Sequence, residues 1–281
     1  MAGESITRRR FLFVAGVVIG GSLGAGGAWL LRSDGDRAAV TPPTTSPSTT
    51  TVTTATPAPT STNPSTTAET PATTTTSPTM TAPPAGETIA AICKEAWGAQ
   101  PVAGGFTSHT IEHITVHHTA VVLQSNMAAP ARARQHQSYH QSLGWADLAY
   151  HYLVDANGHV YEGRPVGAAG DTATDYDPTG HFLVCCEGDF NSQEITAAQY
   201  ESLVKLLAWG VAEFGVEASS IRGHRDVAAT TCPGDNLHPL IAEGTVAEDV
   251  ASIVAGGVPE LEVLCGPRGA EVVAAIEAGQ A

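Results

Sequence analysis

Apolar and polar positions follow regular patterns from about residue 87 onward. Three runs in that part are rich in β-branched and apolar residues and predict strands: Ile111–Thr119, Leu148–Val154 and Phe182–Cys186. Asn157-Gly158 is a strong signal for a hairpin turn, so we expect the chain to return as a strand over His159–Glu162. The pattern therefore predicts several short strands.

Two segments have a helical pattern instead. The spacing of Ala, Arg and Gln in Asn126–Leu143 is consistent with a helix that ends at Gly144. The clearer helix is Thr196–Phe214, where Thr196 and Gln199 predict a capping box. Its apolar face consists of Leu203, Leu206, Leu207 and Val211. Because strands and helices alternate, the sequence predicts an α/β domain in which helices cover a central sheet.

Residues 1–40 have a different character. The segment Thr7-Arg8-Arg9-Arg10-Phe11-Leu12 leads into an uncharged, glycine-rich run from Phe11 to Leu31. Adjacent arginines before such a run resemble an export signal of the twin-arginine type. The run of 21 residues is also long enough to span a bilayer, and no clean A-x-A cleavage site precedes the next segment. A cleaved signal and a retained membrane anchor are both open readings.

Residues 41–86 are of low complexity. Thr, Ser and Pro make up 35 of these 46 residues, and Glu69 carries the one charge. Such a segment cannot bury enough apolar surface to offset the entropy of ordering, so we expect a disordered linker. It acts either as a passive spacer or as a stalk that holds the following domain away from a membrane.

Composition places the chemistry in residues 87–281. These 195 residues are enough for one packed core, and they contain all 11 histidines. They hold eight basic and 24 acidic residues, so their net charge is −16, against −15 for the whole chain. Nucleic acids and anionic membrane surfaces require clustered positive charge, so we exclude nucleic acid as a partner.

The cysteine count points to a metal. Five cysteines are an odd number for an exported protein, which leaves one for another role. Cys232 follows His224 by eight residues, and zinc binds both imidazole nitrogen and thiolate. Adjacent His117 and His118 end a predicted strand and face opposite ways, so one of them could supply a third ligand. From spacing alone, ordinary buried histidines remain the alternative.

Five ordered motifs make the chemistry more specific. They are ITVHHTA at 114–120, GWADLAYHY at 144–152, VYEGR at 160–164, GDF at 188–190 and GHRDVAATTCPG at 223–234. Together they resemble the family of peptidoglycan recognition proteins and type-2 N-acetylmuramoyl-L-alanine amidases, which is related to the phage lysozyme-type zinc amidases. The resemblance covers about residues 95–240. It implies a central mixed β-sheet, mostly covered by helices, with a single zinc cleft.

The resemblance also implies roles for individual residues. It gives His117, His224 and Cys232 as ligands of Zn²⁺. Tyr150 would then hydrogen-bond the attacking water or the developing oxyanion, and Thr230 would orient the same group. Members of the family that are active enzymes keep the cysteine, whereas receptor-type members usually replace it. The presence of Cys232 therefore favours an enzyme.

Four further residues are candidates for contacts with substrate: His118, His140, His151 and Arg164. For His118 a supporting structural role is the stronger expectation, and for Arg164 a structural ion pair is an equal alternative. The sequence departs from the family after Arg164. Many members have a Gly-Ala-His motif there, whereas this chain has Val166-Gly167-Ala168-Ala169-Gly170 and then an acidic loop up to Gly180.

The remaining cysteines belong to two pairs. Cys93 and Cys265 flank the domain, and we expect them to form a disulfide that joins its ends. Adjacent Cys185 and Cys186 face opposite sides of a predicted strand. Both a strained vicinal bridge and a free buried pair are open for them.

The sequence thus predicts a function at the bacterial cell wall. We expect an exported, monomeric zinc amidase that cleaves peptidoglycan between the lactyl group of N-acetylmuramic acid and L-alanine. A peptidoglycan-binding module without turnover is the alternative. A third reading keeps hydrolysis but moves it to anhydro-muramyl peptide fragments, and the export signal argues against that role.

Overall fold

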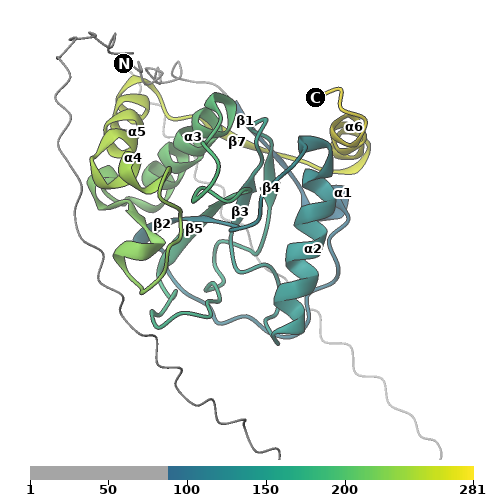
Figure 1. Ribbon diagram of the computed structural model, residues 1–281, viewed down its shortest axis with the longest axis horizontal. Helices are drawn as coiled ribbons and strands as arrows, with labels where there is room; N and C mark the ends of the chain where they lie inside the picture. Colours follow the sequence, from purple (N-terminus) through teal and green to yellow (C-terminus); the bar gives the residue numbers. More distant parts are fainter. Residues whose placement is uncertain (1–87) are drawn as a thin grey trace, which may run out of the picture. The chain divides into compact units, whose positions relative to one another are not determined.

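The computed structural model describes residues 88–281, so the predictions for residues 1–40 and 41–86 lie outside the described residues. A seven-stranded sheet with the order β6-β2-β5-β3-β4-β1-β7 forms the centre of this part (Figure 1). Its strands are β1 (Thr88–Ile92), β2 (His113–His118), β3 (Tyr152–Val154), β4 (Val160–Glu162), β5 (His181–Cys186), β6 (Arg222–Gly223) and β7 (Glu260–Leu264). The β3–β4 pair is antiparallel and the other described neighbours are parallel, so the sheet is mixed as expected.

Helices cover both faces of the sheet. One face carries α3 (Ala197–Phe214), α4 (His238–Ala242) and α5 (Thr245–Gly256), and the other carries α1 (Lys94–Trp97), α2 (Ala129–Ser142) and α6 (Gly266–Glu277) (Figure 1). Three short 3-10 turns complete the elements: η1 (Asn126–Ala128), η2 (Ala218–Ser220) and η3 (His224–Asp226). Each face has its own apolar cluster, a larger one under α3 and α5 and a smaller one under α2 and α6. Within residues 88–281, no helix has the length and apolar character needed to cross a bilayer.

The helix predicted to start at Thr196 is α3, but only one of the two hydrogen bonds of the predicted capping box is present. Thr196 Oγ1 accepts a hydrogen bond from the backbone N–H of Gln199 at 3.1 Å, as in a capping box. The Gln199 side chain does not return to Thr196. Its amide instead donates to the backbone oxygens of Val154 and Glu187, at 2.9 and 3.0 Å. Gln199 therefore ties the helix to the ends of β3 and β5.

The predicted strands are present with shorter bounds. The hairpin at Asn157-Gly158 joins β3 to β4, with Val154 opposite Val160. The predicted strand Leu148–Val154 begins only at Tyr152, because the chain before it forms turns along the cleft described below. We predicted neither the edge strand β7 nor its neighbour β1 from the sequence.

Strand β2 divides its side chains between the two faces. Ile114 and Val116 belong to the apolar cluster under α3, and the intervening residues point to the opposite face. The register pairs His117 with Cys185 of β5, and Cys185 lies in the cluster under α2. His117 therefore faces the α2 side, and His118 faces the α3 side.

A disulfide joins Cys93 and Cys265, as predicted, with a Cα–Cα distance of 5.3 Å. Both cysteines directly follow the last paired residues of neighbouring parallel strands, Ile92 of β1 and Leu264 of β7. The bond therefore continues the β1–β7 ladder. The other three cysteines are free and buried, so no vicinal bridge links Cys185 and Cys186.

Candidate metal centre

The sheet register brings two histidines together. His117 is near the end of β2, and β2 pairs with β6 through Val116 and Gly223. His224 follows Gly223 directly and begins η3. The two imidazole rings consequently lie 4.5 Å apart between centroids. Both side chains are buried, at 3% and 7% exposure for His117 and His224.

The segment after η3 folds back and delivers Cys232 to these rings. The N–H of Arg225 donates to the carbonyl of Cys232 at 2.8 Å, which closes the loop. The N–H of His118 donates to Cys232 Sγ at 3.3 Å, which holds the thiol against the end of β2. Gly234 lets the loop pack closely: it has φ +103°, and a Cβ there would lie 2.4 Å from the carbonyl carbon of Phe190.

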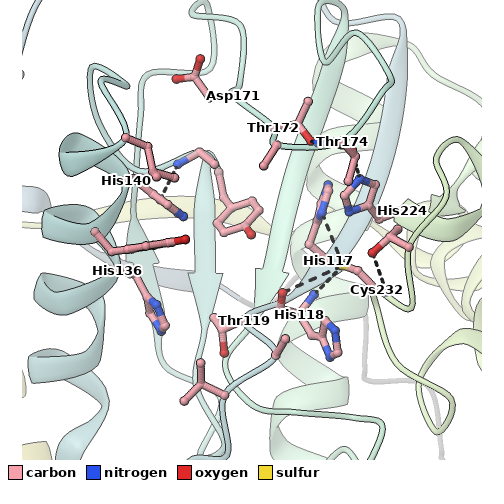
Figure 2. A pocket seen from close by; sticks show the side chains of 18 of the residues that line it. His117, His118, Thr119, His136, His140, Asp171, Thr172, Thr174, His224 and Cys232 are labelled. Carbon is pink, nitrogen blue, oxygen red and sulfur yellow. Dashed lines mark hydrogen bonds between the residues drawn. The ribbon is translucent and has the colours of Figure 1, made fainter. Parts of the chain in front are cut away.

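The three side chains form a group suited to a metal ion (Figure 2). The ligand atoms of His117, His224 and Cys232 all lie within 4.8 Å of one another, and Cys232 Sγ is 3.6 Å from His117 Nδ1. Zinc with bonds of about 2.0–2.3 Å in a tetrahedron would bring such atoms to within roughly 3.4–3.8 Å. A small contraction would therefore suffice, and two imidazoles with one thiolate are donors that zinc favours. The residues fit the ion.

Burial sets the protonation of this group. It lowers the pKa of His224 to about 4 and moves the pKa of His117 well below its ordinary value. It also raises the pKa of the Cys232 thiol to about 12. The histidines are thus neutral, as ligation requires. The thiolate needs a cation beside it, which a divalent metal ion would supply.

A cleft of about 310 Å³ opens beside the cluster. Tyr150 and His140 line it, as does Thr230, whose Oγ1 accepts a hydrogen bond from the N–H of Cys232 at 3.2 Å. The ring of Tyr150 lies 5.1 Å from that of His117 and 5.7 Å from that of His140. Burial raises the pKa of Tyr150 well above its ordinary value. Three of the residues expected beside the zinc cleft therefore do lie there.

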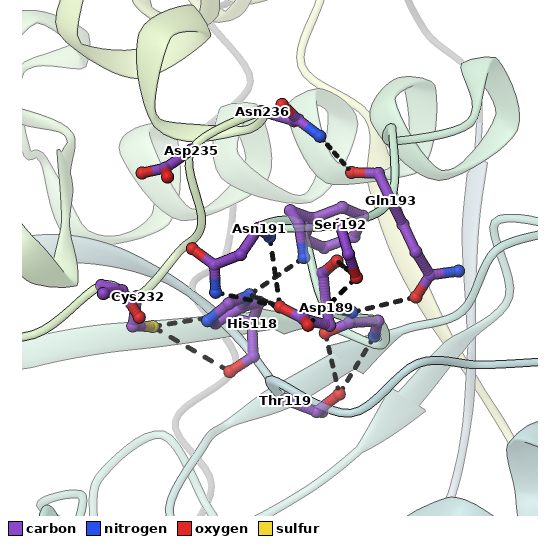
Figure 3. Close-up of polar contacts among 12 residues, drawn as sticks. His118, Thr119, Asp189, Asn191, Ser192, Gln193, Cys232, Asp235 and Asn236 are labelled. Carbon is purple, nitrogen blue, oxygen red and sulfur yellow. Dashed lines mark hydrogen bonds and ion pairs between the residues drawn. The ribbon is translucent and has the colours of Figure 1, made fainter. Parts of the chain in front are cut away.

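His118 also borders the cleft, but its side chain faces the α3 side of β2, opposite to His117, and Figure 3 shows its polar contacts there. Its Nδ1 accepts a hydrogen bond from the N–H of Phe190 at 3.2 Å, and its ring stacks on the Phe190 ring. Asp189 lies 3.9 Å from the same nitrogen and takes part in a turn with Asn191 and Ser192 (Figure 3). Because the His118 side chain contacts Phe190 and Asp189 while its backbone N–H holds Cys232, the structure favours the supporting role over a substrate contact.

Two other predicted contacts are corrected by the structure. His151 is fully buried: its Nε2 donates to the carbonyl of Ala168 at 3.0 Å, and its Nδ1 accepts from the N–H of Leu183 at 2.9 Å. Both nitrogens are thus occupied by the backbone, outside the cleft. The Arg164 guanidinium is also buried, donates to backbone carbonyls and pairs with Asp171. Arg164 is the structural ion pair that was its alternative role.

The cleft and the metal cluster have polar neighbours that the sequence reasoning missed. Thr172, Thr174 and Tyr176 come from the acidic loop after Gly170, at every second position. Thr174 Oγ1 lies 2.9 Å from Nε2 of His224, and Thr172 and Thr174 are among the residues that line the cleft. The alternation with Asp171, Ala173, Asp175 and Asp177 was the available signal.

The end of the cleft beside α2 has another polar residue that we did not predict. His136 lies one helical turn before His140 and also lines the cleft. Its Nε2 is 2.9 Å from an oxygen of the buried Glu187.

The fold and this centre together define a mixed α/β domain with a His-His-Cys cluster at one side of an open cleft. The family model described as N-acetylmuramoyl-L-alanine amidase matches residues 107–235. Peptidoglycan-recognition protein SC2 of Drosophila melanogaster is 33% identical over 153 residues, which are 53% of this chain and 83% of that protein. The endolysin of Enterobacteria phage T3 is 32% identical over 133 residues, 46% of this chain and 83% of that protein.

Solved structures of peptidoglycan recognition proteins are also similar to this chain. The Drosophila peptidoglycan recognition protein SD aligns with a TM-score of 0.51 and 25% identity, covering 56% of this chain and 95% of that one. A complex of tracheal cytotoxin with the ectodomains of recognition proteins LCa and LCx aligns with a TM-score of 0.50 and 28% identity, over 55% and 95% of the two chains. The chain belongs to the family of peptidoglycan recognition proteins and type-2 N-acetylmuramoyl-L-alanine amidases.

Proposed function

We propose that the domain is a zinc-dependent N-acetylmuramoyl-L-alanine amidase. Its substrate would be the amide between the lactyl group of N-acetylmuramic acid and L-alanine in peptidoglycan. The observation that carries the proposal is Cys232, whose thiol lies with the imidazoles of His117 and His224 in one buried group. A module that only bound peptidoglycan would have no need of a third ligand beside these histidines.

The residues around the cleft support amide hydrolysis. His117, His224 and Cys232 would hold zinc, which when bound supplies Lewis acidity for the amide carbonyl and for the attacking water. Tyr150 keeps its proton at neutral pH because the ordinary pKa of a phenol is about 10. Its hydroxyl can therefore donate a hydrogen bond to the oxygen that gains charge. The Thr230 hydroxyl, fixed by the N–H of Cys232, can orient the same oxygen.

The sequence outside the described residues bears on where the domain acts. A twin-arginine-type start and a Thr/Pro/Ser-rich segment support a proposal that the chain is exported to the bacterial cell wall, secreted or held by an N-terminal anchor. The Cys93–Cys265 disulfide supports it as well, because such bonds persist in oxidising compartments. We further propose that the domain works as a monomer.

Digestion of defined muropeptides, with products identified by mass, tests the enzyme proposal. We expect release of intact stem peptides, loss of that release with a chelator and its return with zinc. Cys232→Ala should lose both zinc and activity. Cys186→Ala is the matched control, because Cys186 is also a free and buried cysteine, and it lies in the apolar cluster under α3, on the other side of the sheet from His117.

The possible outcomes separate the readings. Full activity in Cys232→Ala, or activity that chelators do not affect, would contradict the metal assignment. Binding of muropeptides without any product would instead support a recognition module. Turnover confined to anhydro-muramyl peptides would move the substrate to wall fragments.

A further inference from the structure

The loop Asp171–Asp177 has two sides with different surroundings. Ala173, Asp175 and Asp177 are exposed, whereas Thr172, Thr174 and Tyr176 are half-buried, and the hydroxyls of Thr174 and Tyr176 lie against the two histidines of the metal cluster. Figure 2 shows Thr172 and Thr174 above the ring of His224. The negative charges at 175 and 177 therefore point to solvent, and hydroxyl groups point to the histidines.

Hydrogen bonds connect these hydroxyls to His224 in a short chain. Thr174 Oγ1 lies 2.9 Å from His224 Nε2 and 2.7 Å from Thr172 Oγ1. The N–H of Thr174 also donates to Thr172 Oγ1 at 3.1 Å. If His224 Nε2 carries the proton and donates to Thr174, the Thr174 hydroxyl can donate onward to Thr172. That arrangement leaves His224 Nδ1 with its lone pair free for a metal ion.

Tyr176 provides a parallel contact on the other histidine. Its hydroxyl is 3.5 Å from His117 Nε2, while His117 Nδ1 is the nitrogen that faces Cys232 Sγ. The Tyr176 ring also packs on His224, with the ring centroids 5.0 Å apart. In both histidines Nε2 lies near a hydroxyl of this loop, and in His117 the other nitrogen is the one that faces Cys232.

We infer that the Asp171–Asp177 loop positions the metal ligands, with Thr174 as the residue that fixes the tautomer and orientation of His224. Groups that hold the second nitrogen of a ligating histidine typically change metal affinity by about 10–100-fold when removed. The inference rests on the proposed zinc site. It assigns a role to a loop that lies where the sequence departs from the Gly-Ala-His pattern of many relatives.

Zinc affinity of the full chain, measured by competition with a chromogenic chelator, tests this role. We expect Thr174→Val to weaken zinc binding by about 10–100-fold, with the melting temperature of the zinc-free protein unchanged. Thr174→Ser keeps the hydroxyl and should bind zinc like the wild type. Thr179→Val is the matched control, because Thr179 is an exposed threonine two residues after this loop and its N–H donates a hydrogen bond to Asp177, not to either histidine.

Equal zinc affinity in Thr174→Val and Thr179→Val would overturn the inference, as would a Thr174→Ser variant as weak as Thr174→Val. If Thr174→Val does not fold, Thr174→Ala removes the same hydroxyl with less bulk and is judged by the same criterion. Wild-type protein that binds no zinc would refute the proposed metal site itself. A wild type that binds zinc, together with a Thr174→Val variant of the same affinity, would refute only the role of the loop.

Discussion

Removal of the Cys93–Cys265 disulfide should destabilise the domain strongly, since the bond closes a very long loop. The two cysteines are separated by 172 positions in the sequence. In the chain-entropy model, a cross-link over that length lowers the entropy of the unfolded chain by about 17 cal/mol/K. At 25 °C this corresponds to about 5 kcal/mol of stability, and measured disulfides generally contribute between 2 and about 5 kcal/mol.

Urea unfolding of oxidised wild type and of Cys93→Ser, Cys265→Ser and the double variant measures this contribution. Because either substitution removes the same cross-link, the two single variants and the double variant should lose nearly equal free energy. The loss corresponds to a fall in melting temperature of roughly 10–20 °C for a full 5 kcal/mol. A reducing agent should lower the stability of the wild type and leave the variants unchanged.

Two results would refute this reasoning. Variants with a free energy of unfolding within about 0.5 kcal/mol of the wild type would show that the bond does not constrain the unfolded chain. A double variant that loses about twice as much as each single variant would show that the two side chains act through separate packing contacts, not through their bond.

Two further predictions concern the cleft and its support. Tyr150→Phe should lower kcat by about 10²–10³-fold, because it removes one hydrogen-bond donor to the developing charge. Steady-state kinetics and metal analysis would measure this, and the zinc content should be unchanged. An unchanged kcat would exclude that role for Tyr150. Burial lowers the pKa of His151 to about 3, so the unfolded chain binds a proton more readily than the folded one between pH 6.5 and 3. The contribution of His151 to the free energy of unfolding should therefore be fully present above about pH 6.5 and be lost as the pH drops towards 3. In urea titrations the free energy of unfolding of His151→Gln should fall less steeply over this range. A fall identical to that of the wild type would contradict the role given to His151.

The sequence predicted the central part of the fold well, because its strands are buried on both faces. Phe182–Cys186 and the core of Ile111–Thr119 are continuous apolar or β-branched runs, and such runs are typical of interior parallel strands. Glu260–Leu264 could not be recognised in the same way. It is an edge strand that begins with alternating acidic and apolar residues and is buried only at Leu264, so its place depends on pairing with β1.

The metal cluster followed from motifs, but the roles of neighbouring residues required the structure. Strand alternation separated His117 from His118. Tyr150 and His151 precede β3, so only the structure shows that Tyr150 lines the cleft and that His151 is buried. Arg164 could not be placed from sequence, because its burial depends on backbone carbonyls at Asp147 and Leu148 as well as on its ion pair with Asp171. Thr174 was missed because its contact with His224, fifty positions away, depends on the fold, and the alternation in its loop indicates two sides without saying what either side contacts.

The position of the disulfide determines how the domain would respond to tension. A pulling force applied between Thr88 and the C-terminus would pass along β1 to Cys93, cross to Cys265 and leave through α6. The chain between the two cysteines contains every residue that lines the cleft, so the covalent path of the force bypasses the cleft. In the oxidised protein, tension would reach the cluster of His117, His224 and Cys232 only through non-covalent contacts, such as the pairing of β1 with β4.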